Sequence, residues 1–243
     1  MDLKLFSYDC QAAEGYISCP EGVQGSNDMY IHYNTAQILT IAAVMEIEDP
    51  LVYAHCFRVA GYAVTIAQHM HLMPAEVITI EQAGLLHDVG KVAIAGSILN
   101  KPACLTKKEY EKVKAHSVVG ERVVRKIVGL EHLAPLVRSH HERYDGFGYP
   151  DGVSGDSIPL GARIIAVADA FDAMISNRPY RKARTITASA RELELCSGTQ
   201  FDPKVVQVFL KAMREDKEPW RTFTDVTRAF FRYLSIFTSI YIG

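Results

Sequence analysis

The sequence has few cysteines and no pair of them at metal-binding spacing. Its five cysteines lie far apart, and none forms a C-x-x-C pair. An odd number of widely spaced cysteines argues against a disulfide framework and against a thiolate metal site. The pattern is typical of a protein of a reducing compartment, so we expect a cytoplasmic location.

The chain also lacks an excess of one charge and a long apolar run. Lys and Arg total 26 against 28 Asp and Glu, which predicts no general attraction to nucleic-acid polymers or membranes. The first ten residues contain no apolar core followed by a cleavage site, so no secretory signal is expected. Residues 229–243 are apolar, but the segment is short and Arg232 interrupts it. We therefore predict no transmembrane segment.

Alternating runs of β-branched residues are absent as well, and this argues against a sheet. The 243 residues, 49% of them apolar, can bury the core of one large domain. Helical periodicity begins near Tyr30, which predicts an all-α bundle. We expect a leader or linker at 1–28, a helical domain at 29–213 and a C-terminal extension of unassigned role at 214–243. The predicted helices are 36–48, 51–69, 74–87, 107–128, 133–141, 161–176, 186–195 and 203–214.

Two helix starts carry their own capping chemistry. Thr106 followed by Glu109 is a capping box, in which the hydroxyl and the carboxylate satisfy backbone donors of the following helix. Asp202 precedes Pro203, whose missing N–H costs nothing at a first helical position. Both patterns favour helices that begin directly after these residues.

Seven ionisable residues in apolar, helix-forming sequence are His55, His87, Asp88, His116, His140, His141 and Asp169. Five imidazoles and two carboxylates can hold two metal ions, because one carboxylate can bridge the ions. His116 recurs at spacings of three and four with apolar residues, so it is predicted to point at the core. Asp169 lies in a nearly uncharged segment, where an unpaired carboxylate would be strongly penalised. Singly each is weak evidence, but together they predict metal-assisted chemistry on phosphate.

Lys91 extends this cluster, and the adjacent histidines limit its geometry. Lys91 lies three residues beyond Asp88 and can share its face if the helix continues, where an ammonium could hold a phosphoryl oxygen. His140 and His141 are adjacent, so both can reach one ion only near a helix end. The Gly- and Pro-rich stretch that begins at Asp145 is predicted to supply that end.

Six ordered motifs between about residues 45 and 212 resemble those of the HD-GYP proteins, a branch of the HD superfamily of metal-dependent phosphohydrolases. They are LLHDVGK from Leu85, His116 with Gly120, HHERYDGFGYP from His140, ADAFDAM from Ala168, NRPYR from Asn177 and GTQFDP from Gly198. The resemblance implies a helical bundle of the HD-domain type with a Gly- and Pro-rich GYP loop.

The activity that this resemblance implies is hydrolysis of cyclic di-GMP to linear pGpG, with further cleavage to GMP in some members, by a hydroxide that bridges two metals. It assigns His55, His87, Asp88 and Asp169 to one metal, and Asp88, His116, His140 and His141 to the other. Asp88 and Lys91 would be catalytic, and Lys91 would contact the scissile phosphate. Tyr149, Arg178 and Arg181 would contact the rest of the ligand.

The sequence departs from many three-metal members of this family at one position. Leu51 stands where they carry a glutamate, and leucine cannot ligate, so we predict two metals and a preference for stopping at pGpG. Nitrogen and oxygen ligands suit divalent transition metals, with iron as the first expectation and manganese or nickel as the others. Asp172, a turn beyond Asp169, is predicted to orient a ligand.

Other functions stay open. Another HD-type phosphohydrolase would act on cyclic GMP-AMP or (p)ppGpp, and a binding or docking module would hold cyclic di-GMP with little turnover. Gly146, Gly148 and Gly152 predict a supple loop that could contact a protein partner, for example a diguanylate cyclase-type domain. A homodimer is a further open expectation.

Overall fold

The computed structural model describes residues 37–38, 40–42, 44–45, 50–177 and 182–215. Within these ranges the chain is helical, and an isolated bridge between Ser197 and Phe201 is the extended pairing that they contain. The predicted all-α class is therefore confirmed. The expected leader, residues 216–243 of the expected extension, and both Arg178 and Arg181 lie outside the described residues. The domain boundaries at 28 and 213 stay predictions.

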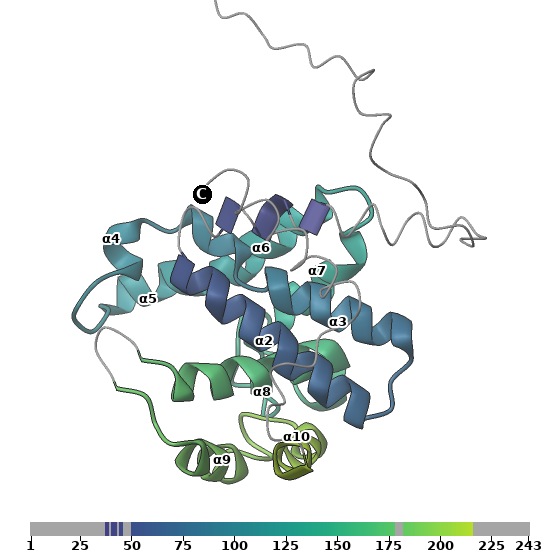
Figure 1. Cartoon of the computed structure of the whole chain (residues 1–243). Helices are drawn as coiled ribbons and strands as arrows, with labels where there is room; N and C mark the ends of the chain where they lie inside the picture. Colours follow the sequence, from purple (N-terminus) through teal and green to yellow (C-terminus); the bar gives the residue numbers. More distant parts are fainter. Residues whose placement is uncertain (1–36, 39, 43, 46–49, 178–181, 216–243) are drawn as a thin grey trace, which may run out of the picture.

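Three helices form the centre of the bundle (Figure 1). α2 (Pro50–His69) packs against α3 (Pro74–Leu86) on one side and α8 (Leu160–Ile175) on another. α10 (Pro203–Glu215) covers α2 and α8, and α9 (Ile186–Leu195) packs against α8 and α10. None of the helices in the described ranges combines the length and the hydrophobicity needed to cross a bilayer.

The second half of the bundle consists of shorter helices. α6 (His116–Arg125) packs on η1 (Val89–Ala93) and on α7 (Ala134–Ser139), and α7 also contacts α3 and α8. α5 (Lys107–Lys114) leads directly into α6. The remaining short helices are α4 (Gly96–Leu99), η2 (Glu131–Leu133) and η3 (Gly155–Ser157).

The core contains an aromatic cluster that joins α2, α8 and α10. The ring centroids of Tyr62 and Phe171 lie 5.2 Å apart, and those of Phe171 and Phe209 lie 4.9 Å apart, both edge to face. All three side chains are buried, and such pairs add to the hydrophobic stabilisation from burial alone. The cluster fixes α2 against α8, the two helices that carry His55 and Asp169.

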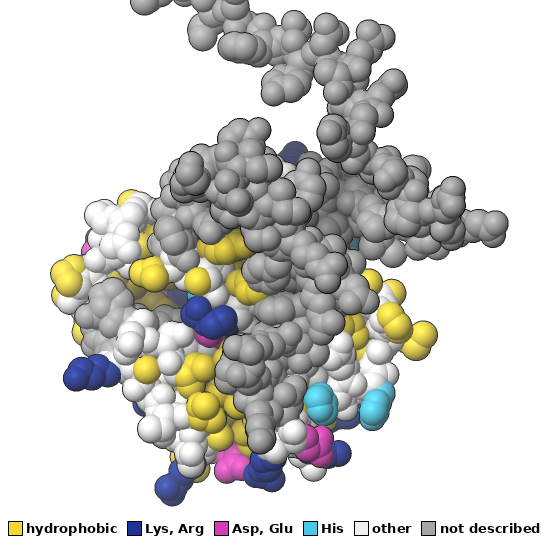
Figure 2. All heavy atoms as spheres, viewed as in Figure 1, with side chains coloured by type: hydrophobic (Ala, Val, Ile, Leu, Met, Phe, Trp, Pro, Cys, Tyr) yellow, Lys and Arg dark blue, Asp and Glu magenta, His cyan; other side chains and the backbone are white. Residues whose placement is uncertain are grey.

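Charged side chains of both signs are scattered over the coloured part of the face in Figure 2, and the Lys and Arg side chains lie apart from one another there. Any attraction for an anionic ligand on the described part of this face would therefore have to be local.

Both predicted helix caps are present. The Glu109 N–H donates to Thr106 Oγ1 at 3.3 Å, and the Thr106 N–H donates to Glu109 Oε2 at 2.7 Å. At α10 the Lys204 N–H donates to Asp202 Oδ1 at 2.8 Å. The capping pattern therefore located the beginnings of α5 and α10 correctly.

The single helix predicted for 107–128 is wrong. α5 ends at Lys114, α6 begins at His116, and α6 ends at Arg125. The structure shows a backbone contact at this break: a Cβ atom on Gly90 would lie 2.0 Å from the carbonyl oxygen of His116 and 2.6 Å from the backbone nitrogen of Gly120. The η1 backbone therefore packs directly on the start of α6, and apolar periodicity carries no sign of such a contact.

Two other predicted helices end early. α3 ends at Leu86, and the chain continues as the 3-10 helix η1, so Lys91 does not share one α-helix with Asp88. α7 ends at Ser139, before both histidines, whereas the predicted end lay at 141. Because both helices end early, His87, Asp88, His140 and His141 lie beyond the helix ends. Adjacent side chains there can point toward the same site, which they cannot do within a regular helix.

Candidate metal centre

The structure brings the seven predicted ligands together at helix ends and on two central helices. His87 caps the end of α3 and Asp88 begins η1, while His140 caps the end of α7. The other members are His116 at the start of α6, His141, and His55 and Asp169 on α2 and α8. Two groups with ligand atoms close enough for one ion are His55, His87 and Asp169, and His116, His140 and His141.

The first group, here the carboxylate half, consists of His55, His87 and Asp169. His55 Nε2 lies 3.1 Å from Asp169 Oδ1, and its Nδ1 lies 2.7 Å from Asp172 Oδ2. Burial alone would lower the pKa of His55, but these two carboxylates raise it to about 9. His55 in turn holds the pKa of Asp169 well below its usual value despite burial. The carboxylate half therefore attracts positive charge.

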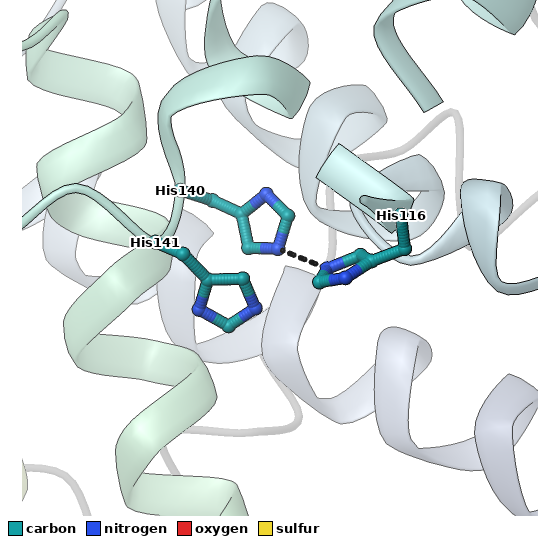
Figure 3. Close-up of side chains that lie close together, drawn as sticks. All are labelled: His116, His140 and His141. Carbon is teal, nitrogen blue, oxygen red and sulfur yellow. Dashed lines mark hydrogen bonds between the residues drawn. The ribbon is translucent and has the colours of Figure 1, made fainter. Parts of the chain in front are cut away.

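The second group, here the imidazole half, consists of His116, His140 and His141. Figure 3 shows the three rings facing one space, with His116 arriving from a different helix than the adjacent pair. His116 Nε2 lies 3.2 Å from His140 Nε2. Burial lowers the pKa of each imidazole, to about 4 for His141, so all three are neutral at pH 7. Neutral imidazole is the form that binds a metal ion.

Backbone carbonyls select the tautomer of three of these histidines. In His87, His116 and His140, Nδ1 lies 2.7 Å from the carbonyl oxygen of the third residue before it. A carbonyl can only accept, so Nδ1 carries the hydrogen and the Nε2 lone pair points away from the backbone. His87 Nε2 is buried and has no hydrogen-bond partner in the described structure, and two further lone pairs face each other. Converging lone pairs of this kind fit a cation.

Asp88 lies between the two halves and is 2% exposed. Its Oδ1 is 3.5 Å from His116 Nε2, and its Oδ2 is 3.4 Å from His87 Nε2 and 3.8 Å from His55 Nε2. Lys91 Nζ donates to Oδ2 at 2.5 Å even though α3 has ended. Burial would raise the pKa of Asp88, but Lys91 and His87 hold it well below its usual range. One ionised carboxylate thus faces both halves with different oxygens.

Behind the carboxylate half stands a residue that the sequence analysis missed. Arg58 Nε donates to Asp172 Oδ1 at 2.6 Å, and its Nη2 donates to Asp172 Oδ2 at 3.0 Å. Asp172 is buried and accepts from His55 as well, which agrees with the orienting role predicted for it. The sequence feature that could have indicated Arg58 is its position one turn after His55 on the same helix. A fixed Asp172 holds the His55 ring in one orientation.

Cys56 is a second residue that the sequence did not indicate. Its thiol forms a third candidate metal-binding group with His87 and Asp88, and the side chain is buried. The absence of C-x-x-C pairs therefore did not exclude a sulfur atom beside the site. Cysteine spacing is informative only when two thiols bind one ion, and here the other members come from the turn between α3 and η1.

The GYP loop, residues 145–155, lies beside the imidazole half. The Tyr149 ring lies 4.8 Å from the His141 ring at an interplanar angle of 31°, and the Tyr149 N–H donates to the His141 carbonyl at 3.2 Å. A Cβ atom on Gly148 would lie 2.2 Å from the backbone nitrogen of Arg143. Gly148 is therefore required for close packing, which places Tyr149 against the histidines.

The motif GTQFDP supports this loop from the other side. The Asp145 N–H donates to the Thr199 carbonyl at 2.8 Å, and the Tyr144 N–H donates to the Gln200 carbonyl at 3.2 Å. Two motifs more than fifty residues apart thus share backbone hydrogen bonds. The GTQFDP motif therefore helps to fix the backbone that follows His141.

Residues 40–205 match the model of the HD domain family, and the chain belongs to that family. A cyclic di-GMP phosphodiesterase of Thermotoga maritima is 38% identical over 182 residues, covering 74% of this chain and 50% of that protein. The cyclic di-GMP phosphodiesterase response regulator RpfG of Xanthomonas campestris is 41% identical, covering 70% and 46%. A 3'3'-cGAMP-specific phosphodiesterase of Vibrio cholerae is 36% identical, covering 72% and 38%. The chain spans half or less of the length of these relatives.

Solved structures agree with the fold. A cyclic GMP-AMP-specific phosphodiesterase of Vibrio cholerae superposes with a TM-score of 0.60 at 20% identity, covering 83% of this chain and 53% of that one. Bd1817, an HDGYP protein of Bdellovibrio bacteriovorus, superposes with a TM-score of 0.55 at 18% identity, covering 76% and 60%. The predicted HD-type bundle is thereby confirmed, and the family match and the relatives above confirm the resemblance to HD-GYP proteins.

Proposed function

We propose that this chain hydrolyses cyclic di-GMP to linear pGpG with the help of two divalent transition metals. The observation that carries the proposal is Asp88, whose two oxygens face the carboxylate half and the imidazole half separately. Relatives named as cyclic di-GMP phosphodiesterases support the substrate. We include in this proposal a second hydrolysis step, in which pGpG is cleaved to GMP.

The metal ligands follow from the two halves. His55, His87, Asp88 and Asp169 would hold one ion, and Asp88, His116, His140 and His141 would hold the other. HD-domain phosphohydrolases depend on metals, and the donor set contains the nitrogen and oxygen atoms that suit iron, with manganese or nickel as alternatives. Two bound ions would lower the pKa of water and neutralise charge on the phosphate.

Lys91 and Tyr149 have complementary tasks toward the ligand. Lys91 keeps its proton because Asp88 raises its pKa against burial, so its ammonium can donate to an oxygen of the scissile phosphate. Burial and the nearby Tyr110 raise the pKa of the Tyr149 hydroxyl, so this group also keeps its proton and can donate. Arg178 and Arg181 are proposed to contact the second phosphate or a guanine.

Cyclic GMP-AMP is the second candidate substrate, because a 36% identical relative is named as specific for it. The two cyclic dinucleotides share both phosphates and differ in one base. The imidazole half adds three ligands beyond what an HD-type hydrolase of (p)ppGpp needs, which argues against that substrate. A docking module without turnover would need no such complete ligand set.

Purification without oxygen, metal quantification and chromatography of the digests test the proposal. We expect about two metals per chain, cleavage of cyclic di-GMP to pGpG, and slower cleavage of cyclic GMP-AMP. Full activity with fewer than two metals per chain would contradict the two-metal proposal. Absence of cleavage of every cyclic dinucleotide by the metal-loaded protein would contradict the proposed function itself.

The proposal includes a protein partner at the GYP loop, such as a diguanylate cyclase-type domain. Phe147 in this loop is 85% exposed, and exposed aromatic side chains are enriched at protein interfaces. A cytoplasmic location and a homodimer are part of the same proposal. Light scattering of the purified protein and fractionation of cells would test these two points.

A further inference from the structure

Lys114 occupies an aromatic site next to the imidazole half. It is the last residue of α5, and its Nζ lies 5.5 Å from the ring centroid of Tyr110 and 5.7 Å from that of Tyr149. The Tyr149 ring also lies 4.8 Å from the His141 ring. One tyrosine ring therefore contacts both this ammonium and a proposed metal ligand.

The ammonium of Lys114 has a weakly held partner. It pairs with Glu111 Oε1 at 2.8 Å, but the Glu111 side chain is 55% exposed. Exposed pairs of this kind contribute little, because water competes for both groups. An incoming phosphate could consequently replace Glu111, since it offers a higher charge and several acceptor oxygens.

The two lysines at the site differ in what they face. Lys91 is bound to the buried Asp88 between the halves, where the scissile phosphate is proposed to lie. Lys114 Nζ instead lies over the rings of Tyr149 and Tyr110. Both tyrosine rings contact the Lys114 ammonium and so hold the cation in place, where a phosphate of a bound nucleotide could meet it.

We propose that Lys114 binds the phosphate of the cyclic dinucleotide that is not hydrolysed, and that the rings of Tyr110 and Tyr149 hold its ammonium in place. This inference rests on the proposed function and adds a binding residue to it. It makes Lys114 a determinant of affinity for a ligand with two phosphates. A phosphodiester with one phosphate would not use it.

Lys114→Met tests the proposal, with Lys112→Met as the matched control from an exposed position on the same helix. Each metal-loaded protein is assayed with cyclic di-GMP and with bis(p-nitrophenyl) phosphate, which has neither a second phosphate nor a purine. We expect Lys114→Met to raise the KM for cyclic di-GMP by about 10-fold or more with little change in kcat. Its rate on the small diester should stay at the wild-type value, and Lys112→Met should match wild type on both substrates.

Two further variants keep the test decisive. Lys114→Gln removes the charge but keeps a polar stem, and it carries the test if the Met variant unfolds. Tyr110→Leu should raise the KM for cyclic di-GMP as well, since it removes one of the two rings that hold the Lys114 ammonium in place. Salt should raise the KM of the wild type more steeply than that of Lys114→Met.

The outcomes separate this inference from the proposed function. If wild type cleaves cyclic di-GMP and the KM of both Lys114 variants equals that of wild type, the inference is overturned and the proposed function stands. Equal losses on both substrates would also overturn it, because they indicate a structural role. If wild type cleaves no cyclic dinucleotide, the proposed function and this inference are both contradicted.

Discussion

The two halves of the candidate metal centre attract a cation by different physical means. In the carboxylate half, Asp169 and Asp172 surround His55 and raise its pKa to about 9. In the imidazole half, burial lowers the histidine pKa values, to about 4 for His141. One half therefore offers negative charge, and the other offers neutral lone pairs held in place by the backbone.

This difference shows how a helical bundle can bind two ions of the same kind without stacking like charges in its core. Carboxylates on both sides would repel one another and would raise each other's pKa values. Asp88 contacts histidines of both halves, and Lys91 compensates its charge. The arrangement predicts that the halves can be disabled separately, whereas loss of Asp88 disables both.

The largest expected effect is that of Asp88→Ala. Because the carboxylate contacts histidines of both halves, turnover of cyclic di-GMP should fall on the order of 10³-fold, and metal content should fall with it. Metal quantification beside steady-state kinetics measures both. Asp156→Ala is the control, since Asp156 is 87% exposed and pairs only at the surface with Arg163. Two metals per chain in Asp88→Ala would show that Asp88 does not join the halves.

A pair of variants addresses the halves one at a time. His55→Ala and His140→Ala should each lower the bound metal from about two to about one per chain, with activity reduced about 100-fold. Metal content after dialysis and thermal unfolding of each variant provide the measurement. If one of them loses both metals while remaining folded, the halves are not independent sites.

A smaller effect is expected from the hydrogen bonds behind the carboxylate half. Asp172→Asn keeps the shape of the side chain but weakens its bonds to His55 and Arg58, so metal affinity should fall about 10-fold at one site. Competition with a chelator should show that one ion is bound less tightly than in the wild type and that the affinity for the other ion is unchanged. Asp156→Asn, at an 87% exposed position, is the control for a loss of charge elsewhere. Equal loss of affinity for both ions would show that Asp172 does not act on the carboxylate half alone.

The smallest effect concerns stability near the imidazole half. Thr106→Ala removes the cap of α5, the helix that precedes His116, and should lower the free energy of unfolding by about 1 kcal/mol. Thr185→Ala removes the matching cap of α9, where the Ala188 N–H donates to Thr185 Oγ1 at 3.1 Å. Denaturant unfolding should give similar losses for both, with turnover unchanged. A loss of turnover in Thr106→Ala alone would mean that the cap also positions the metal ligands.

Much of the fold could be predicted from local patterns. Capping residues marked the beginnings of α5 and α10 because their bonds lie within four residues of one another. The break at Ala115 was missed because it accompanies the contact between Gly90 and the backbone of His116, residues that are far apart in the chain. Periodicity reports which face of a helix is apolar and carries no information on where another backbone touches it.

The candidate site divides in the same way. The seven ligand candidates were recognisable as ionisable residues in apolar sequence. Arg58 was missed because its partner, Asp172, lies on α8, and the contact of Lys114 with Tyr149 was missed because Tyr149 lies in the GYP loop. A lysine or arginine on an amphipathic helix has the same local pattern whether it faces water or a ligand.

The sequence by itself determined the helical class, the helix caps and the set of side chains able to bind metal, because propensity, capping and ligand chemistry belong to residues and their near neighbours. Only the tertiary structure decided that the carboxylates gather around His55 while the lone pairs of His116 and His140 face each other. The physical reason is that pKa values and tautomers depend on burial and on distances between atoms of different helices. Those distances exist only once α2, α6, α7 and α8 have packed.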